Sequence, residues 1–192
     1  MSNERDFTTL WGGDYISVVS PTDAAYEAVL ESDMVQVIPV DVPLAEVIIR
    51  RETCPPYTLR EPDGGYEQFY TVVSGGIEDG ETATETALRE VQEEIGIDVQ
   101  AADYELIQLT PEGIPYTKGT AARVTLFALM LFSYQTEEPE GDGTPYEELS
   151  TFERVPLQQI DEVLLTSQAD LLLHCAIAKL KNVILLELAP DS

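Results

Sequence analysis

The chain has 192 residues, which is enough for one domain with an extension and too few for two domains of ordinary size. Its 36 Asp and Glu residues outnumber ten Lys and Arg residues, and the formal net charge is -26. Such a surface repels nucleic acid and anionic membranes, which argues against both kinds of partner, and an anionic substrate must be met by local positive charge.

The rare residue types exclude further classes of site. The two cysteines, Cys54 and Cys175, and the single histidine, His174, do not have the spacing of zinc ligands, and nothing supports a disulfide. No segment has the apolar length of a signal peptide or of a membrane-spanning helix. We therefore expect a cytoplasmic protein.

The first part of the chain predicts β-structure. Residues 1–33 are typical of an extension ahead of a main domain over 34–192, with short strands over 14–20 and 26–30. In the main domain, β-rich runs predict three strands, over 34–40, 44–51 and 67–73. The last strand leads directly into Gly75 and Gly76.

A helix is predicted over 82–95. Thr82 is a good N-cap, Glu85 follows three residues later as in a capping box, and Gly96 stands at the C-cap. The 3.6-residue period predicts one apolar face, formed by Thr84, Ala87, Leu88, Val91 and Ile95. A separate arc collects three carboxylates, those of Glu90, Glu93 and Glu94.

This acidic arc predicts a bound cation. Like charges one helical turn apart repel each other unless a partner neutralises them. Arg89 can pair with Glu93, which leaves Glu90 and Glu94 facing the same point. Carboxylate ligands of this kind suit hard cations, Mg²⁺ first and Mn²⁺ second. The alternative is a solvated acidic helix, but it does not account for the neighbouring glycines and the arginine.

The rest of the chain completes an α/β pattern. Strands are predicted over 104–110 and 122–132, with a loop over 111–119 between them. A charged, Gly/Pro-rich segment over 137–145 is followed by a strand, a short helix and a last helix, over 150–155, from 156 to about 165, and from 168 to about 182. This order predicts an α/β/α sandwich, a mixed sheet between helices.

The spacing within 75–97 is also a family signature. Gly75, Glu81 and the run REVQEEIGI over 89–97 stand where the complete Nudix box has its fixed positions, so the chain resembles the Nudix hydrolases. The segment SGGIEDGE over 74–81 is similar to the box of ADP-ribose pyrophosphatases, and the N-terminal arm resembles the arm that those enzymes exchange across a homodimer. The resemblance implies the same sandwich fold with an N-terminal β-rich extension, and a homodimer.

The resemblance also implies a reaction, hydrolysis of a nucleoside diphosphate linked to another moiety. ADP-ribose or another nucleoside diphosphate sugar is the leading substrate. Dinucleoside polyphosphates, NADH and modified nucleoside triphosphates are the enzymatic alternatives. A nucleotide-sensing domain without catalysis is an alternative of another class.

Matching the box residue by residue implies the roles of its side chains. Glu90 and Glu94 would bind the metal, with Glu93 as a further ligand, and the backbone carbonyl of Ser74 would add an oxygen. Arg89 would orient Glu93. The role of Glu81 stays open between action through a water molecule and a favourable charge at the helix N-terminus.

Residues around the box complete the predicted site. In similar enzymes the general base often lies on a loop before the last strand, which here favours Glu148 over Glu147, with solvated loop charges as the alternative. One of Arg50 and Arg51 is predicted to reach a substrate phosphate, because guanidinium matches that oxygen geometry, and a surface salt bridge is the alternative. Gly75 and Gly76 would let the backbone approach a metal-bound phosphate.

Overall fold

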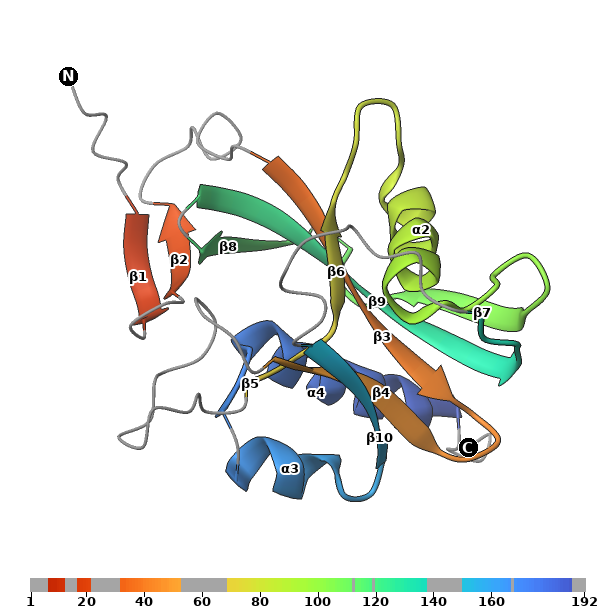
Figure 1. Cartoon of the computed structure of the whole chain (residues 1–192). Helices are drawn as coiled ribbons and strands as arrows, with labels where there is room; N and C mark the ends of the chain where they lie inside the picture. The colour runs from red at the N-terminus through yellow and green to blue at the C-terminus, as the bar shows by residue number, and fades with distance from the viewer. Residues whose placement is uncertain are drawn as a thin grey trace.

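A computed structural model describes residues 7–12, 17–21, 32–52, 69–111, 113–118, 120–137, 150–166 and 168–187. In these residues eleven strands form one mixed sheet, and helices cover both of its faces (Figure 1). The N-terminal strands are β1 Phe7–Gly12 and β2 Ser17–Pro21. The remaining strands are β3 Ser32–Asp41, β4 Glu46–Glu52, β5 Phe69–Thr71, β6 Val73–Gly76, β7 Asp103–Gln108, β8 Ile114–Lys118, β9 Thr120–Ser133, β10 Ser150–Pro156 and β11 Gln168–Ala169. The helices are α2 Ala83–Ile95, α3 Ile160–Thr166 and α4 Leu171–Glu187.

The sheet runs in the order β1-β2-β8-β9-β3-β4-β5-β11, while β6 pairs with β3, β7 with β9 and β10 with β4. The pairs β3–β9 and β5–β11 are parallel, and the other pairs are antiparallel. The central strands β3 and β9 are buried on both faces, which explains their nearly continuous apolar sequences.

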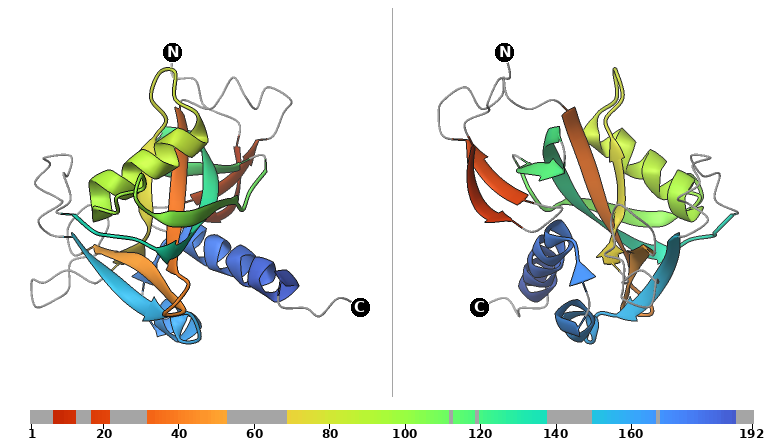
Figure 2. Two further views of the ribbon diagram at one scale, coloured as in Figure 1. Left: turned by 90° about the vertical axis from the view of Figure 1, so that its right-hand side faces the viewer. Right: turned by 60° about the vertical axis from the view of Figure 1, so that its left-hand side comes forward.

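Alternation along the central strands builds two apolar layers. On β3, Val35 and Val37 pack in one layer with Ala87 and Val91 of α2. Ile38 and Val40 of the same strand face the opposite way. They pack in a second layer with residues of α3 and α4. Figure 2 shows α2 on one side of the sheet and α3 and α4 on the other. The predicted α/β/α sandwich is therefore confirmed.

The β3–β4 hairpin opens to admit another segment, and this positions the candidate site. The two strands pair directly only next to their turn, at Val40↔Val47 and Asp41↔Glu46. Farther along, β5 pairs with β4 and β6 pairs with β3, so the segment 69–76 lies between the two arms of the hairpin. The end of β4 and the two glycines that end β6, Gly75 and Gly76, are thereby brought under the same helix, α2.

Several predicted boundaries need correction. The predicted loop over 111–119 contains β8, a strand that pairs antiparallel with β9. Pro111 and Pro115 made this segment look like a loop, but a strand paired fully on only one side tolerates a residue without an amide hydrogen. The short helix α3 begins at Ile160 instead of 156, after a turn, and α4 extends to Glu187.

The N-terminal extension contains strands, as predicted, although in different places. β1 was not predicted, and β2 covers residues 17–20 of the strand predicted over 14–20, whose first residues, 14–16, lie outside the described residues. The strand predicted over 26–30 lies outside the described residues. The two strands form a hairpin that reaches the sheet at Ser17↔Thr117 (Figure 1). The domain boundary at 33/34 and the homodimer stay predictions.

The described helices include none that is long and apolar enough to cross a membrane.

Candidate functional site

Helix α2 has both of the ends that the sequence predicts. The Thr82 Oγ1 atom accepts a hydrogen bond from the Glu85 amide at 3.3 Å, and Glu85 Oε2 accepts one from the Thr82 amide at 2.9 Å. Gly96 adopts a left-handed conformation with φ 67°, and its amide donates to the Gln92 carbonyl. These caps fix where the helix starts and therefore which side chains face the sheet.

The apolar face of α2 differs from the prediction at one position. Ala87 and Val91 are buried, and Leu88 and Ile95 are partly buried against the same layer. Thr84 is exposed, and Thr86 is buried in its place. A buried threonine is tolerated here because its hydroxyl donates toward Glu81 Oε2 at 2.9 Å.

Arg89 is the centre of a hydrogen-bond network around the helix. Its Nη1 atom donates to Glu93 Oε2 at 2.9 Å, the predicted pair, and also to Glu90 Oε1 at 2.7 Å. Its Nε and Nη2 atoms donate to the two oxygens of Glu81 at 2.9 and 3.1 Å. Nη2 also donates to the Gly76 carbonyl at 3.2 Å. One guanidinium thus joins two carboxylates of the acidic arc to the end of β6.

Glu81 has a role that neither sequence hypothesis included. Its carboxylate accepts two hydrogen bonds from Arg89, one from the Thr86 hydroxyl and one from the Glu78 amide. The hydrogen bonds from Arg89, followed by those from Thr86 and the Glu78 amide, lower the pKa of Glu81 from 4.5 to about 2. Glu81 therefore anchors the guanidinium that holds Glu90 and Glu93.

We expect the Glu81→Gln variant to have a lower Tm than the wild type near neutral pH. Because the folded-state pKa of Glu81 lies below the ordinary value, this carboxylate stabilises the fold above about pH 4.5 and loses that contribution as the pH falls toward 2. Thermal unfolding followed by circular dichroism across this pH range would show the Tm gap shrinking in acid. The exposed Glu105→Gln variant is the control, and a gap that stays constant with pH would contradict the prediction.

Gly75 makes room for the carboxylate of Glu90. A Cβ atom at position 75 would lie 1.8 Å from Glu90 Oε1 and 2.0 Å from Glu90 Cδ, so no larger residue fits beside this carboxylate. Burial raises the pKa of Glu90, and the charge and hydrogen bond of Arg89 oppose that shift. A Cβ atom at Gly76 would meet nothing within 4 Å. The two glycines, predicted to act alike, therefore have different surroundings.

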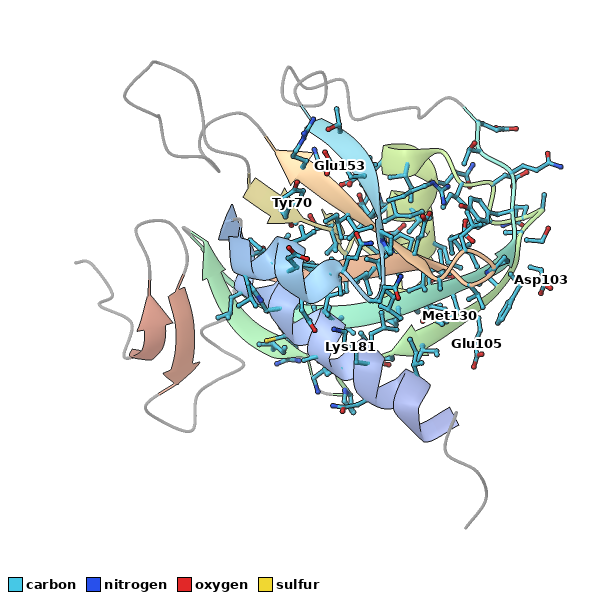
Figure 3. All side chains as sticks on the ribbon, turned by 90° about the horizontal axis from the view of Figure 1, so that it is seen from below. Tyr70, Asp103, Glu105, Met130, Glu153 and Lys181 are labelled. Carbon is cyan, nitrogen blue, oxygen red and sulfur yellow. The ribbon has the colours of Figure 1, made fainter. Side chains whose placement is uncertain are left out.

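The two predicted phosphate-binding arginines lie on opposite faces of β4. Arg50 lies on the α2 face, and its Nη1 atom donates to Glu94 Oε2 at 3.2 Å. Arg51 points to the α4 face, where it forms an ion pair with Glu153 at 2.8 Å. Tyr70 donates to the same Glu153 carboxylate at 3.1 Å, and the two labelled side chains lie together in Figure 3. Of these two arginines Arg50 lies beside the acidic arc, and each of the two forms a salt bridge, the arrangement predicted as the alternative.

The donor atoms at the acidic arc suit a hard cation. Glu90 and Glu94 present carboxylates one turn apart, and Glu90 lies against Gly75, the residue that follows Ser74 on β6. In the described residues, no three acidic, histidine or cysteine side chains come together in an arrangement that could hold a metal. The three glutamates are bonded to guanidinium groups instead, Glu94 to Arg50 and the other two to Arg89. Glu147 and Glu148 lie outside the described residues.

A cavity of about 350 Å³ opens on the flank of α2. Arg89 and Glu93 line it together with Leu88, Gln92 and Val99. The described residues that line the cavity do not include Glu90 or Glu94.

Comparison with known proteins decides the family. The NUDIX domain model matches residues 47–174, more than half of the chain. The chain belongs to the Nudix hydrolase family. No curated protein matches this sequence.

Solved structures of Nudix hydrolases share the fold. An ADP compounds hydrolase is 18% identical, with a TM-score of 0.54, covering 93% of this chain and 91% of its own. A NUDIX hydrolase from Nitrosomonas europaea is 15% identical, with a TM-score of 0.54 and coverage of 79% and 88%. A Nudix hydrolase from M. Smegmatis is 11% identical, with a TM-score of 0.52 and coverage of 85% and 91%. At these identities the likeness concerns the Nudix fold.

Proposed function

We propose that this Nudix protein hydrolyses the pyrophosphate bond of a nucleoside diphosphate derivative, with ADP-ribose or another nucleoside diphosphate sugar as the leading substrate. One observation carries the proposal. Glu90 and Glu94, two carboxylates suited to a divalent cation, stand one turn apart on α2, and Glu94 is paired with Arg50, a cation suited to a phosphate. The resemblance of 74–81 to the box of ADP-ribose pyrophosphatases and the fold shared with an ADP compounds hydrolase support this substrate class.

The proposed cation ligands are Glu90, Glu94, Glu93 and the backbone carbonyl of Ser74. Mg²⁺ is the first candidate and Mn²⁺ the second, because both prefer oxygen ligands. When bound, such an ion neutralises phosphate charge and lowers the pKa of a coordinated water. Arg89 holds Glu90 and Glu93 in position through the bonds described above, and Gly75 leaves the space that Glu90 occupies.

In the proposed reaction, a water oxygen forms a bond to one phosphorus and the bridging P–O bond breaks, which gives a nucleoside monophosphate and a phosphorylated second moiety. Arg50 would bind a substrate phosphate on the α2 face. We propose Glu148, in preference to Glu147, as the base that accepts the proton of the water. We expect Glu148→Gln to lower kcat more than tenfold, and a smaller loss would return this role to another group.

Incubation of the protein with Mg²⁺ and a nucleotide panel tests the proposed function. The panel contains ADP-ribose, a nucleoside diphosphate sugar, a dinucleoside polyphosphate, NADH and a modified nucleoside triphosphate. We expect AMP and ribose 5-phosphate from ADP-ribose, and no product once EDTA removes the metal. Tight binding of ADP-ribose without any product would instead support the sensor, although the complete set of Arg89 and three glutamates favours catalysis.

A further inference from the structure

An ion pair between Arg50 and Glu94 joins the catalytic helix to the sheet. Arg50 Nη1 lies 3.2 Å from Glu94 Oε2, and the two side chains are only 16% and 15% exposed. The proposed function assigns these groups to different ligands, Glu94 to the cation and Arg50 to a phosphate. The inference below rests on that proposed function and concerns how the two ligands influence each other.

A divalent cation and Arg50 compete for the same carboxylate. If a cation binds Glu94 while the guanidinium stays in place, two positive groups lie side by side in a mostly buried position, where water screens them poorly. The repulsion disappears if Arg50 turns to another anion. A substrate phosphate is suitable, because its oxygens accept two parallel hydrogen bonds from a guanidinium.

Arg89 is less suited to such an exchange. Its guanidinium donates to Glu81, Glu90, Glu93 and the Gly76 carbonyl, with several contacts between 2.7 and 2.9 Å. These partners approach from the end of β6, from the segment before α2 and from α2 itself, so turning the group away would break the whole network. Arg50 instead reaches Glu94 from strand β4, across the interface between sheet and helix, at 3.2 Å.

We infer that Arg50 is an exchangeable counter-ion. It neutralises Glu94 when no cation is bound, and it moves to a substrate phosphate when a cation takes Glu94. Binding of the cation and binding of the phosphate are thereby coupled, and each makes the other more favourable. The cation alone binds weakly because it must displace a guanidinium that has no phosphate to receive it.

Mn²⁺ titration of the full-length protein, followed by electron paramagnetic resonance, tests this inference without measuring turnover. We expect Arg50→Gln to bind Mn²⁺ alone about fivefold more tightly than the wild type, because the competitor is gone. We expect the Mn²⁺-loaded variant to bind AMP about tenfold more weakly. The affinities of Arg50→Lys for Mn²⁺ and for AMP should lie between those of the wild type and those of Arg50→Gln. Lys181→Gln removes one positive charge from an ion pair with Asp161 on α4 and should leave both affinities unchanged.

The opposite directions of the two effects distinguish exchange from a structural role. If Arg50 only supported the fold, its loss would weaken both Mn²⁺ and AMP binding, and that result would overturn the inference. An unchanged Mn²⁺ affinity in Arg50→Gln would overturn the inference as well. In that case the proposed function would still stand if the wild type hydrolyses its substrate. A wild type that binds no Mn²⁺ would overturn the proposed function and the inference together.

Discussion

We expect the Glu90→Gln variant to fold like the wild type and to lose about a thousandfold in metal-dependent kcat. A cation supplies several kcal/mol of transition-state stabilisation, and about 4 kcal/mol corresponds to this loss. The amide keeps the shape of the side chain but removes the charge that we propose binds the ion. Steady-state hydrolysis of ADP-ribose at several Mg²⁺ concentrations measures the effect, and excess Mg²⁺ should restore little.

The control for Glu90→Gln is Glu105→Gln, which removes one negative charge at an exposed position of β7. Figure 3 shows Glu105 beside Met130, its cross-strand partner. We expect Glu105→Gln to keep the wild-type kcat. A Glu90→Gln protein that retains more than about a tenth of the wild-type kcat would show that this carboxylate is not an essential cation ligand.

We expect the Gly75→Ala variant to lose about a hundredfold in kcat while its free energy of unfolding changes by less than about 1 kcal/mol. The added methyl group would occupy the position of the Glu90 carboxylate, 1.8 Å from Oε1. Because this carboxylate is the far end of a flexible side chain, it can turn away with little strain on the fold. The loss falls on catalysis, since Glu90 no longer points to the cation.

Gly76→Ala is the matched comparison, because a methyl group there meets nothing within 4 Å. We expect Gly76→Ala to lose far less activity than Gly75→Ala, and urea unfolding to give similar stabilities for both variants. Mn²⁺ titration should show weaker binding for Gly75→Ala. Equal activities for the two alanine variants would mean that the position of Glu90 against residue 75 does not matter for the reaction.

Short-range signals predicted helix α2 well. Thr82, Glu85 and Gly96 act within one turn of the helix ends, so the limits of α2 could be derived from neighbouring residues. The pair Arg89–Glu93 follows from helical spacing alone. The bonds between Arg89 and Glu81 could not be derived in this way, because they depend on the path of the loop that precedes the helix.

Two other differences between the predictions and the structure had separate causes. Arg50 and Arg51 are neighbours on a strand, and the two-residue period already places such neighbours on opposite faces, so their separation was available in the sequence. The pairing that makes 114–118 a strand was not available, because it depends on contact with β9. Pro115 then gave a local signal for a loop that the long-range pairing overrides.

The parallel pairing of β3 with β9 has a consequence for how the protein folds. Val35 lies beside Thr125, a residue far along the chain, and the whole of helix α2 lies between them in sequence. During synthesis β3 leaves the ribosome well before β9 exists, so the backbone edge that pairs with β9 stays unpaired, and the apolar side chains of β3 stay uncovered, for much of translation. Such high contact order slows folding and exposes a strand prone to aggregation. We therefore expect slow refolding, and insoluble products from chains that end before residue 120.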